Sequence, residues 1–330
     1  MADVDAPGAT LVAPRPPITV DAHVDVPWIM TKIGRFKLNE DNEGRFSEVD
    51  LVRMKKGGLQ SAIFALYLSD SMQDQLGPSE SLNYICRQIA FLENQLGMLL
   101  VDDPEIALDS VTVGITPIFL GLEGGRLING DIRMLEKFRT LGVRYLTVTH
   151  NRSTEWADSA TDLPKHGDAG LTMFGRNIVH EANRLGILMD VSHGSDATAW
   201  AILTEASLPV IASHSGCKEL TNHPRNLSDY LLKAIARKKG VICIPFARRF
   251  AGSTFRSVVD HVDHVVQTTG STTYVGIGSD LDGAGLASGI DDVSDWKKVV
   301  LDELANRGFS GKCIAAVAGG NILRVLREGL

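Results

Sequence analysis

The sequence predicts an α/β protein that folds as a single-domain (β/α)₈ barrel, the TIM-barrel architecture. Eight short apolar runs are spread along the chain, and segments with the period of a helix lie between most of them. The length of 330 residues would suit about two average domains, but α/β barrels reach this size as one domain. The hydrophobic content of 44% is sufficient for one large core.

The eight apolar runs are interpreted as strands of a parallel sheet. Most of them are nearly continuous in apolar residues and do not alternate cleanly with polar ones. This pattern is typical of strands that are covered on both faces, as in a parallel sheet. The runs span residues 18–23, 61–68, 115–123, 143–150, 187–193, 209–214, 240–246 and 274–280.

Segments of helical period separate most of these runs. In one of them Phe174 and Ile178 fall on a common apolar stripe, and Gly186 is expected to end the helix. In the next, Asp196 is expected to cap the helix. The predicted helices span residues 81–97, 173–186, 196–207, 227–240, 255–270, 295–308 and 313–328.

The rest of the chain is interpreted as loops and one terminal arm. Residues 1–17 are predicted to be a flexible arm, since they are acidic, interrupted by prolines and unlike a signal peptide. The barrel domain is predicted to span residues 18–330. Stretches rich in Gly, Asp, Asn and Ser at 31–58, 151–170 and 281–295 are predicted to be loops.

Composition excludes several classes of partner. The formal net charge is -7 and no basic stripe is present, so no nucleic-acid partner is expected. No apolar run is long enough to span a membrane, so no membrane partner is expected. The four cysteines are far apart and form no C-x-x-C motif, which suits a reducing compartment. A cytoplasmic location is therefore expected.

Ionisable residues follow six of the eight apolar runs. Barrel enzymes carry their chemistry at the carboxyl ends of the strands, so these side chains are expected to meet at one rim. Burying so many ionisable groups is costly unless they pair with one another or bind metal. The residues are His23 with Asp25, Glu123, His150, His193, His214 and Asp280.

The remaining histidines do not follow this pattern. His166 lies in a predicted loop, and His180 lies on a predicted helix away from its apolar stripe. His261 and His264 lie beside two aspartates, which indicates a solvated helix face. His223 precedes a proline in a loop and is left unassigned. A lone histidine is most often an ordinary core or surface residue, so these five carry no site prediction.

The mixture of imidazoles and carboxylates suits zinc or a similar transition metal. Two ions are predicted, with His23 and Asp25 serving one ion and His193 and His214 serving the other. Glu123 would give one oxygen to each ion. Each ion would then have three protein ligands and an open position, as catalytic zinc sites do.

The sequence resembles the membrane dipeptidase (renal dipeptidase) family of the metal-dependent amidohydrolases, whose fold is a (β/α)₈ barrel of the metal-dependent hydrolase type. The resemblance runs from about Val20 to Val325, and it is specific because many motifs occur in the same order and at the same spacing. The motifs are DAHVDVPW, GLEGG, LTVTHNRSTEWADSA, GLTMFGRNIVHEANRLGILMDVSH, PVIASHS, HPRNLSD, VGIGSDLDG and GGNILRV.

The resemblance implies two zinc ions per chain. By it, His23 and Asp25 correspond to ligands of the first ion, and His193 and His214 to ligands of the second. Glu123 corresponds to the bridging carboxylate.

The resemblance assigns three further residues to substrate binding and catalysis. His150 corresponds to the histidine that polarises the scissile carbonyl or steadies its oxyanion. Arg225 corresponds to the arginine that contacts the substrate's C-terminal carboxylate. Asp280 corresponds to the aspartate that contacts substrate and handles protons: it takes the proton of a metal-bridging hydroxide and passes it to the leaving amine. The implied activity is zinc-dependent hydrolysis of small dipeptides, including those with a C-terminal D-residue.

The sequence departs from the family pattern at two places. Arg126 stands where many relatives have histidine, and Pro245, Phe246 and Ala247 replace Asn-Phe-Tyr. That tyrosine helps to hold substrate in relatives, so the departures concern the substrate rather than the metals. A homodimer is expected from relatives, whereas the lipid anchor of the animal members is not.

Three functions therefore remain open from the sequence. The first is a dinuclear zinc dipeptidase. The second is a related dinuclear amidohydrolase that acts on an N-acyl amino acid, a cyclic amide or a lactone. The third is a barrel retained as a binding or scaffold protein, but a degenerate site would be expected to lose metal ligands and this chain keeps all five.

Overall fold

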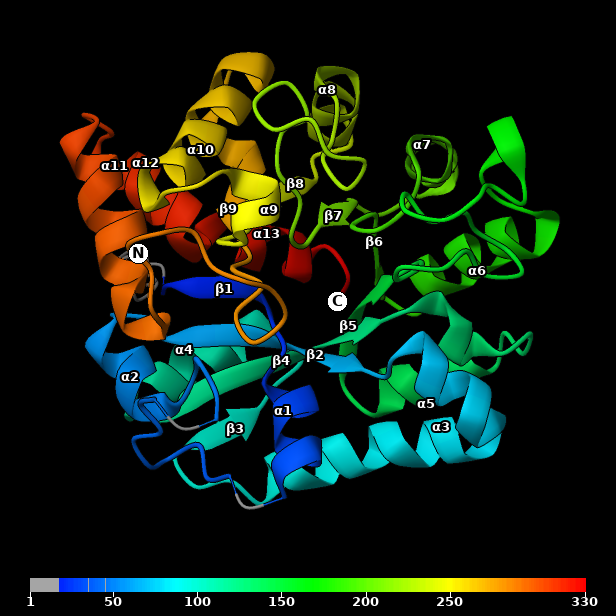
Figure 1. Cartoon of the computed structure of the whole chain (residues 1–330), viewed down its shortest axis with the longest axis horizontal. Coiled ribbons are helices and arrows are strands. Elements are labelled where there is room, and N and C mark those ends of the chain that lie inside the picture. Colours follow the sequence, from blue (N-terminus) through cyan, green and yellow to red (C-terminus); the bar gives the residue numbers. More distant parts are fainter. Residues whose placement is uncertain (1–17, 35, 45) are drawn as a thin grey trace, which may run out of the picture.

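Eight parallel strands form a nearly closed barrel, with helices around the outside (Figure 1). The computed structural model describes residues 18–34, 36–44 and 46–330, so the predicted arm at 1–17 lies outside the described residues. Neighbouring barrel strands pair in the order β1-β2-β4-β5-β6-β7-β8-β9. Strand β3 lies outside this order and pairs in parallel with β4. The predicted fold class is confirmed.

The eight barrel strands coincide with the eight predicted runs, although most are shorter. Their bounds are β1 (Val20–Val24), β2 (Ser61–Tyr67), β4 (Thr116–Glu123), β5 (Val143–Thr147), β6 (Leu188–Asp190), β7 (Ile211–Ala212), β8 (Val241–Ile244) and β9 (Val275–Ile277). The short β3 (Met98–Leu100) was not predicted, since three partly exposed residues leave no strong pattern. His150, His193 and His214 consequently lie in loops just beyond their strands.

Helices follow most of the strands, and their bounds differ from the predictions in several places. The helices are α1 (Val26–Ile33), α2 (Leu51–Lys56), α3 (Asp70–Glu93), α4 (Pro104–Thr112), α5 (Met134–Thr140), α6 (Met173–Arg184), α7 (Asp196–Glu205), α8 (Asp229–Arg237), α9 (Arg248–Ala251), α10 (Phe255–Thr269), α11 (Glu303–Asn306), α12 (Gly311–Ala315) and α13 (Asn321–Arg327). Of these, α1, α2, α4, α5 and α9 were not predicted, and α2 lies inside the stretch predicted to be a loop at 31–58.

Local chemistry explains two of the differences. Helix α3 starts well before the predicted segment, but it is kinked at Gly77 (φ 71°) and contains Pro78, which interrupt the helical period. The prediction that Asp196 caps α7 is wrong. Ser195 is the N-cap, because its side chain accepts a hydrogen bond from the backbone N–H of Thr198.

The prediction of a solvated face at His261 is also wrong. His261 is 1% exposed, and its Nδ1 accepts a hydrogen bond from the backbone N–H of Cys217 at 2.8 Å. Burial lowers the pKa of this imidazole to about 4. His264, three residues further along α10, is partly buried and pairs with Asp229 (Nε2–Oδ1 2.6 Å). His261 thus belongs to the buried stripe of α10, whereas His264 is only partly buried.

Closure of the barrel joins β1 to the segment that follows β9. The backbone N–H of Asp280 donates to the carbonyl of His23 at 3.1 Å, and the N–H of Asp25 donates to the carbonyl of Leu281 at 2.9 Å. These bonds place His23, Asp25 and Asp280 beside one another, although they come from opposite ends of the chain. Within the described residues, no helix is both long enough and apolar enough to cross a membrane.

Candidate metal centre

Five ligand-type side chains converge at the carboxyl ends of the strands. His23 lies in β1, and Glu123 is the last residue of β4. His193 and His214 follow β6 and β7, and Asp25 stands at the N-cap of α1 without capping it, so its carboxylate is free for another partner. All five are at most 7% exposed. The structure therefore brings together every residue predicted to bind metal.

The ligand atoms lie at the separations that a shared cation requires. From Glu123 Oε1, the distances to the Nε2 atoms of His193, His214 and His23 are 3.1, 3.6 and 3.7 Å. His23 Nε2 is 3.6 Å from Asp25 Oδ2. Atoms that each lie about 2.0–2.2 Å from a zinc ion are separated by distances in this range.

Two overlapping groups share Glu123. His23, Asp25 and Glu123 form one group, and Glu123, His193 and His214 form the other; in each, the ligand atoms lie within 4.8 Å of one another. His23 and His214 form a third group with Asp280. The first two groups are those that the sequence predicted for two ions with a bridging carboxylate.

The buried nitrogen atoms fit a metal better than they fit one another. His23 is fully buried, and its Nε2 has no hydrogen-bond partner among the described residues. The Nε2 atoms of His193 and His214 face each other at 3.0 Å. Unpartnered imidazole nitrogens in a dry site are costly, and a divalent cation satisfies all of them at once.

A tyrosine that sequence reasoning missed orients His23. His23 Nδ1 donates to the hydroxyl of Tyr145 at 2.8 Å, and this hydroxyl donates to the carbonyl of Ala22 at 3.3 Å. Nε2 is thereby left with its lone pair toward the metal positions. The ring of Tyr145 fits because Gly121 lacks a side chain: a Cβ there would lie 2.2 Å from the tyrosine Cζ.

A second relay, also missed, orients His214. His214 Nδ1 donates to the hydroxyl of Ser213 at 2.7 Å, and Ser213 donates to Asp190 Oδ2 at 2.6 Å. Thr147 donates to the same carboxylate oxygen at 2.6 Å. The polar residues inside the motifs DVSH and ASHS were the available signal for this relay.

Replacing Tyr145 by phenylalanine is expected to weaken zinc binding by about 10- to 100-fold, the usual effect of removing a group that orients a ligand. The variant leaves the buried His23 Nδ1 with only the Ser213 hydroxyl, at 3.5 Å, as a hydrogen-bond partner. Zinc affinity measured by competition with a chromogenic chelator tests this. Tyr274→Phe is a matched control because this tyrosine lies on the short helix before β9 and contacts none of the ligands. Unchanged affinity in Tyr145→Phe would contradict the orienting role.

The charges around the site divide it into two halves. Burial lowers the pKa of His23, but Glu123 and Asp25 outweigh it and raise this pKa to about 10. Burial raises the pKa of Glu123. Burial, followed by nearby cations, lowers the pKa of His193 and His214 well below their usual range. A proton therefore binds His23, which faces the carboxylates, more readily than it binds His193 or His214. A divalent cation competes with that proton for His23.

Asp280 is held close to the ligands by an unusual backbone. Its φ is 63°, and it is 7% exposed. Burial raises the pKa of Asp280 well above its usual range, and the Asp25 carboxylate adds to the shift. Both carboxylates converge on Gly283, where a Cβ would lie 2.2 Å from Asp25 Oδ2 and 2.5 Å from Asp280 Oδ1. A raised pKa makes this carboxylate a stronger base for proton transfer.

A cavity of about 480 Å³ opens above the ligands. His150 lines it, with Nδ1 3.3 Å from the hydroxyl of Tyr67 and 3.9 Å from Asp70 Oδ2. Its other ring nitrogen remains available to a molecule in the cavity. The lining residues are Asp25, Trp28, Tyr67, Glu123, His150, Asn151, His193, Arg225, Arg249, Phe250, Asp280, Asp282, Gly283, Ala284 and Gly285.

Arg225 is a buried cation with unused donors. It is 4% exposed, its Nη2 donates to the carbonyl of His214 at 3.5 Å, and its guanidinium lies 5.2 Å from the ring centre of Phe250. Its Nε and Nη1 have no partner within the described part of the chain. Burial lowers the pKa of Arg225 to about 10, so it stays charged at neutral pH. An anion in the cavity would satisfy it.

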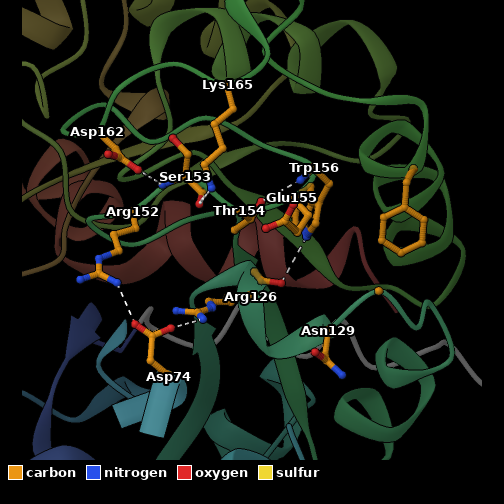
Figure 2. A pocket seen from close by; sticks show the side chains of 13 residues that line it. Asp74, Arg126, Asn129, Arg152, Ser153, Thr154, Glu155, Trp156, Asp162 and Lys165 are labelled. Carbon is orange, nitrogen blue, oxygen red and sulfur yellow. Dashed lines mark hydrogen bonds and ion pairs between the residues drawn. The ribbon is translucent and has the colours of Figure 1, made fainter. Parts of the chain in front are cut away.

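Arg126 and Ala247, the residues at the two departures from the family pattern, lie outside the lining of the cavity above the predicted metal ligands. Arg126 lines a neighbouring pocket of about 480 Å³, where Asp74 pairs with both Arg126 and Arg152 (Figure 2). Arg126 is therefore held outside the metal cavity. Ala247 is fully buried and does not line the cavity either. These two departures leave the ligand set intact.

Comparisons with known proteins agree with the motif resemblance. A family model described as membrane dipeptidase (peptidase family M19) matches residues 14–329. Dipeptidase 3 of Rattus norvegicus is 31% identical over 324 residues, covering 94% of this chain and 64% of the relative. Dipeptidase verJ of Clonostachys rogersoniana is 34% identical over 332 residues, covering 93% and 83% of the two chains.

A solved structure shares the fold. It is a metallo peptidase from Rhodobacter sphaeroides liganded with a phosphinate mimic of the dipeptide L-Ala-D-Ala. Its TM-score is 0.84 with 24% sequence identity, and the match covers 95% of this chain and 100% of that one. This chain spans about 64% of the length of dipeptidase 3, to which it is similar.

Proposed function

Because the chain belongs to the membrane dipeptidase family, peptidase family M19, we propose that it is a zinc-dependent dipeptidase that cleaves the peptide bond of small dipeptides. One observation carries the proposal. Two ligand groups that share Glu123 lie in the same cavity as a buried guanidinium with unused donors. That combination suits a short substrate with a free carboxylate.

The separations of the ligand atoms support two metal positions. His23 and Asp25 would hold one zinc ion, His193 and His214 would hold the other, and Glu123 would contribute to both. When bound, the pair would supply Lewis acidity toward the peptide carbonyl and an activated water as nucleophile. Tyr145 and Ser213 keep the imidazoles in the tautomer that binds metal.

The side chains of the cavity supply binding and proton transfer. Arg225 would hold the C-terminal carboxylate of the dipeptide through guanidinium donors that have no other partner among the described residues. His150 would donate a hydrogen bond to the carbonyl oxygen as negative charge develops on it. Asp280 would accept the proton of the attacking water and return it to the leaving amine, which its raised pKa favours.

The first test is metal content per chain of the purified protein, followed by turnover of L,L and L,D dipeptides. The L,D set is included because the R. sphaeroides structure holds a mimic of L-Ala-D-Ala. Metal at both positions together with dipeptide turnover supports the proposal. Turnover of an N-acyl amino acid without turnover of any dipeptide would replace it by the related amidohydrolase activity. Failure to bind zinc would remove the metal mechanism altogether.

Replacing Arg225 by methionine is expected to raise KM for free dipeptides by about 10- to 100-fold. This is the loss of binding expected when charge-assisted hydrogen bonds to a carboxylate are removed. Dipeptides with an amidated C-terminus should be affected much less, since they offer no carboxylate to this side chain. Steady-state kinetics on matched free and amidated substrates measures the difference. Arg152→Met, in the neighbouring pocket, is the control. Equal effects on both substrate types would mean that Arg225 does not hold the carboxylate.

A further inference from the structure

A second cation lines the cavity on the same wall as Arg225. Arg249 lies on the short helix α9, directly before Phe250, whose ring packs against the Arg225 guanidinium. Arg249 is exposed, whereas Arg225 is buried. Among the described residues, no carboxylate forms an ion pair with Arg249. Its charge is therefore available to a molecule in the cavity.

The backbone beneath Arg249 is held in place. The N–H of Arg248 donates to the carbonyl of Gly285 at 2.9 Å, and the N–H of Ala251 donates to the carbonyl of Ala247 at 2.9 Å. Asn226 Nδ2 donates to the carbonyl of Phe250 at 2.9 Å. Helix α9 is thus tied both to the loop after β9 and to the loop that carries Arg225, so Arg249 is presented from a fixed position.

Four acidic side chains line the cavity, and Asp280 among them lies beside the metal-ligand residues His23 and His214. Asp25 and Glu123 belong to the metal positions. Asp282 accepts hydrogen bonds from the hydroxyl of Ser47 at 2.5 Å and from the backbone N–H of Glu48 at 2.7 Å. None of these carboxylates forms an ion pair with Arg225 or Arg249 within the described part of the chain, so both guanidinium groups remain open to an anion.

The imidazole of His223 is affected by the charges of both Arg249 and Arg225. Burial lowers the pKa of this imidazole, and Arg249 and then Arg225 lower it further. His223 also contacts the ring of Phe250, with the ring centres 5.0 Å apart. The two guanidinium groups therefore act on the same small region of the cavity wall.

We propose that Arg249 determines substrate specificity by binding the side-chain carboxylate of the C-terminal residue of the dipeptide. This inference rests on the proposed dipeptidase function. If buried Arg225 holds the α-carboxylate, the side chain on the same Cα atom extends along this wall toward solvent, where Arg249 stands. Dipeptides that end in Asp or Glu would place one carboxylate on each arginine.

The test compares kcat/KM for Ala-Glu and Ala-Gln, which differ in charge and hardly in size. The wild-type protein is expected to prefer Ala-Glu by about fivefold, the scale of one exposed ion pair. Arg249→Met is expected to bring this ratio close to unity, and Arg249→Glu to invert it. The preference should also decrease as salt is raised, because exposed charges are screened.

Arg248→Met is the matched control. Arg248 is the neighbouring exposed arginine of α9 and does not line the cavity. This variant should keep the wild-type ratio, and metal content should be the same in every variant. A ratio near unity in the wild-type protein would overturn the inference. So would a preference for Ala-Glu that survives in Arg249→Met, or one that Arg248→Met abolishes equally.

The two proposals fail in different ways. If no dipeptide is hydrolysed by metal-loaded protein, the proposed function fails, and the specificity inference fails with it. If Ala-Gln and Ala-Glu are hydrolysed at equal rates, only the role of Arg249 is lost.

Discussion

Replacing Glu123 by glutamine is expected to empty both metal positions and to abolish turnover. Glu123 is the single residue common to the groups around Asp25 and around His193, and its Oε1 lies within 3.7 Å of three imidazole nitrogens. A neutral amide removes the charge that offsets two divalent ions, and its NH₂ group cannot act as a ligand. Metal content after dialysis, measured by atomic emission, tests this directly.

Two other single substitutions make the result specific. Asp25→Asn and His193→Ala each remove a ligand from only one of the two groups that share Glu123. Each is expected to retain one of the two ions, whereas Glu123→Gln retains neither. If Glu123→Gln keeps both ions, the bridging role is wrong. If it loses the same single ion as one of the other variants, Glu123 serves that position alone.

Replacing Asp280 by asparagine is expected to lower kcat by about two to four orders of magnitude, the range of general acid–base catalysis. The amide cannot accept the proton of the attacking water. The fold should be preserved, because asparagine tolerates the positive φ of 63° at this position as well as aspartate does. Single-turnover rates and metal content are measured on the same preparation.

Metal content decides between two roles for Asp280. Its carboxylate also lies in a possible ligand group with His23 and His214. If Asp280→Asn keeps both ions and loses turnover, Asp280 acts in proton transfer, as proposed. If Asp280→Asn loses an ion, Asp280 is a metal ligand. Near-normal turnover in the variant would exclude Asp280 from the mechanism.

The neighbouring aspartate of the same loop is the control for this experiment. Asp282 also has a positive φ, and hydrogen bonds from Ser47 and Glu48 occupy its carboxylate. Asp282→Asn is expected to keep turnover within about tenfold of the wild type, since it removes no proton-transfer group. A loss as large as that in Asp280→Asn would show that general charge in the loop, and not proton transfer, controls the rate.

The pattern of apolar runs was sufficient to predict the barrel. The barrel strands are buried on both faces, so the residues of each form an apolar run that can be recognised without knowledge of its neighbours. The amphipathic helices α6, α8 and α10 were predicted for the same reason, since their apolar stripes are local. Helix α5 was missed because it is short, and α4 because its buried side includes Pro104 and Ser110 and forms no clear apolar stripe. Helix α3 was predicted only in part because Gly77 and Pro78 interrupt its period.

The ligand set was also predictable, because parallel strands end at a common rim and the residues that follow them meet there. His23, Asp25, Glu123, His193 and His214 occupy these positions, and the structure places them within contact distance of one another. The residues that orient them were not predictable in this way. Tyr145 is identified by its hydrogen bond to His23 on another strand, and Ser213 by its hydrogen bond to Asp190 of β6. A single strand carries no sign of such bonds.

The sequence by itself determined the barrel class, the family resemblance and the identity of the residues at the rim, because periodicity and strand ends are local properties of a chain. Only the tertiary structure decided that Arg126 is drawn away by Asp74, that His261 is buried, and that Arg249 stands beside Arg225. Each of these outcomes depends on which charge or surface lies opposite in space. Such pairings arise when the closing barrel and its loops bring distant segments together, and no local pattern encodes them.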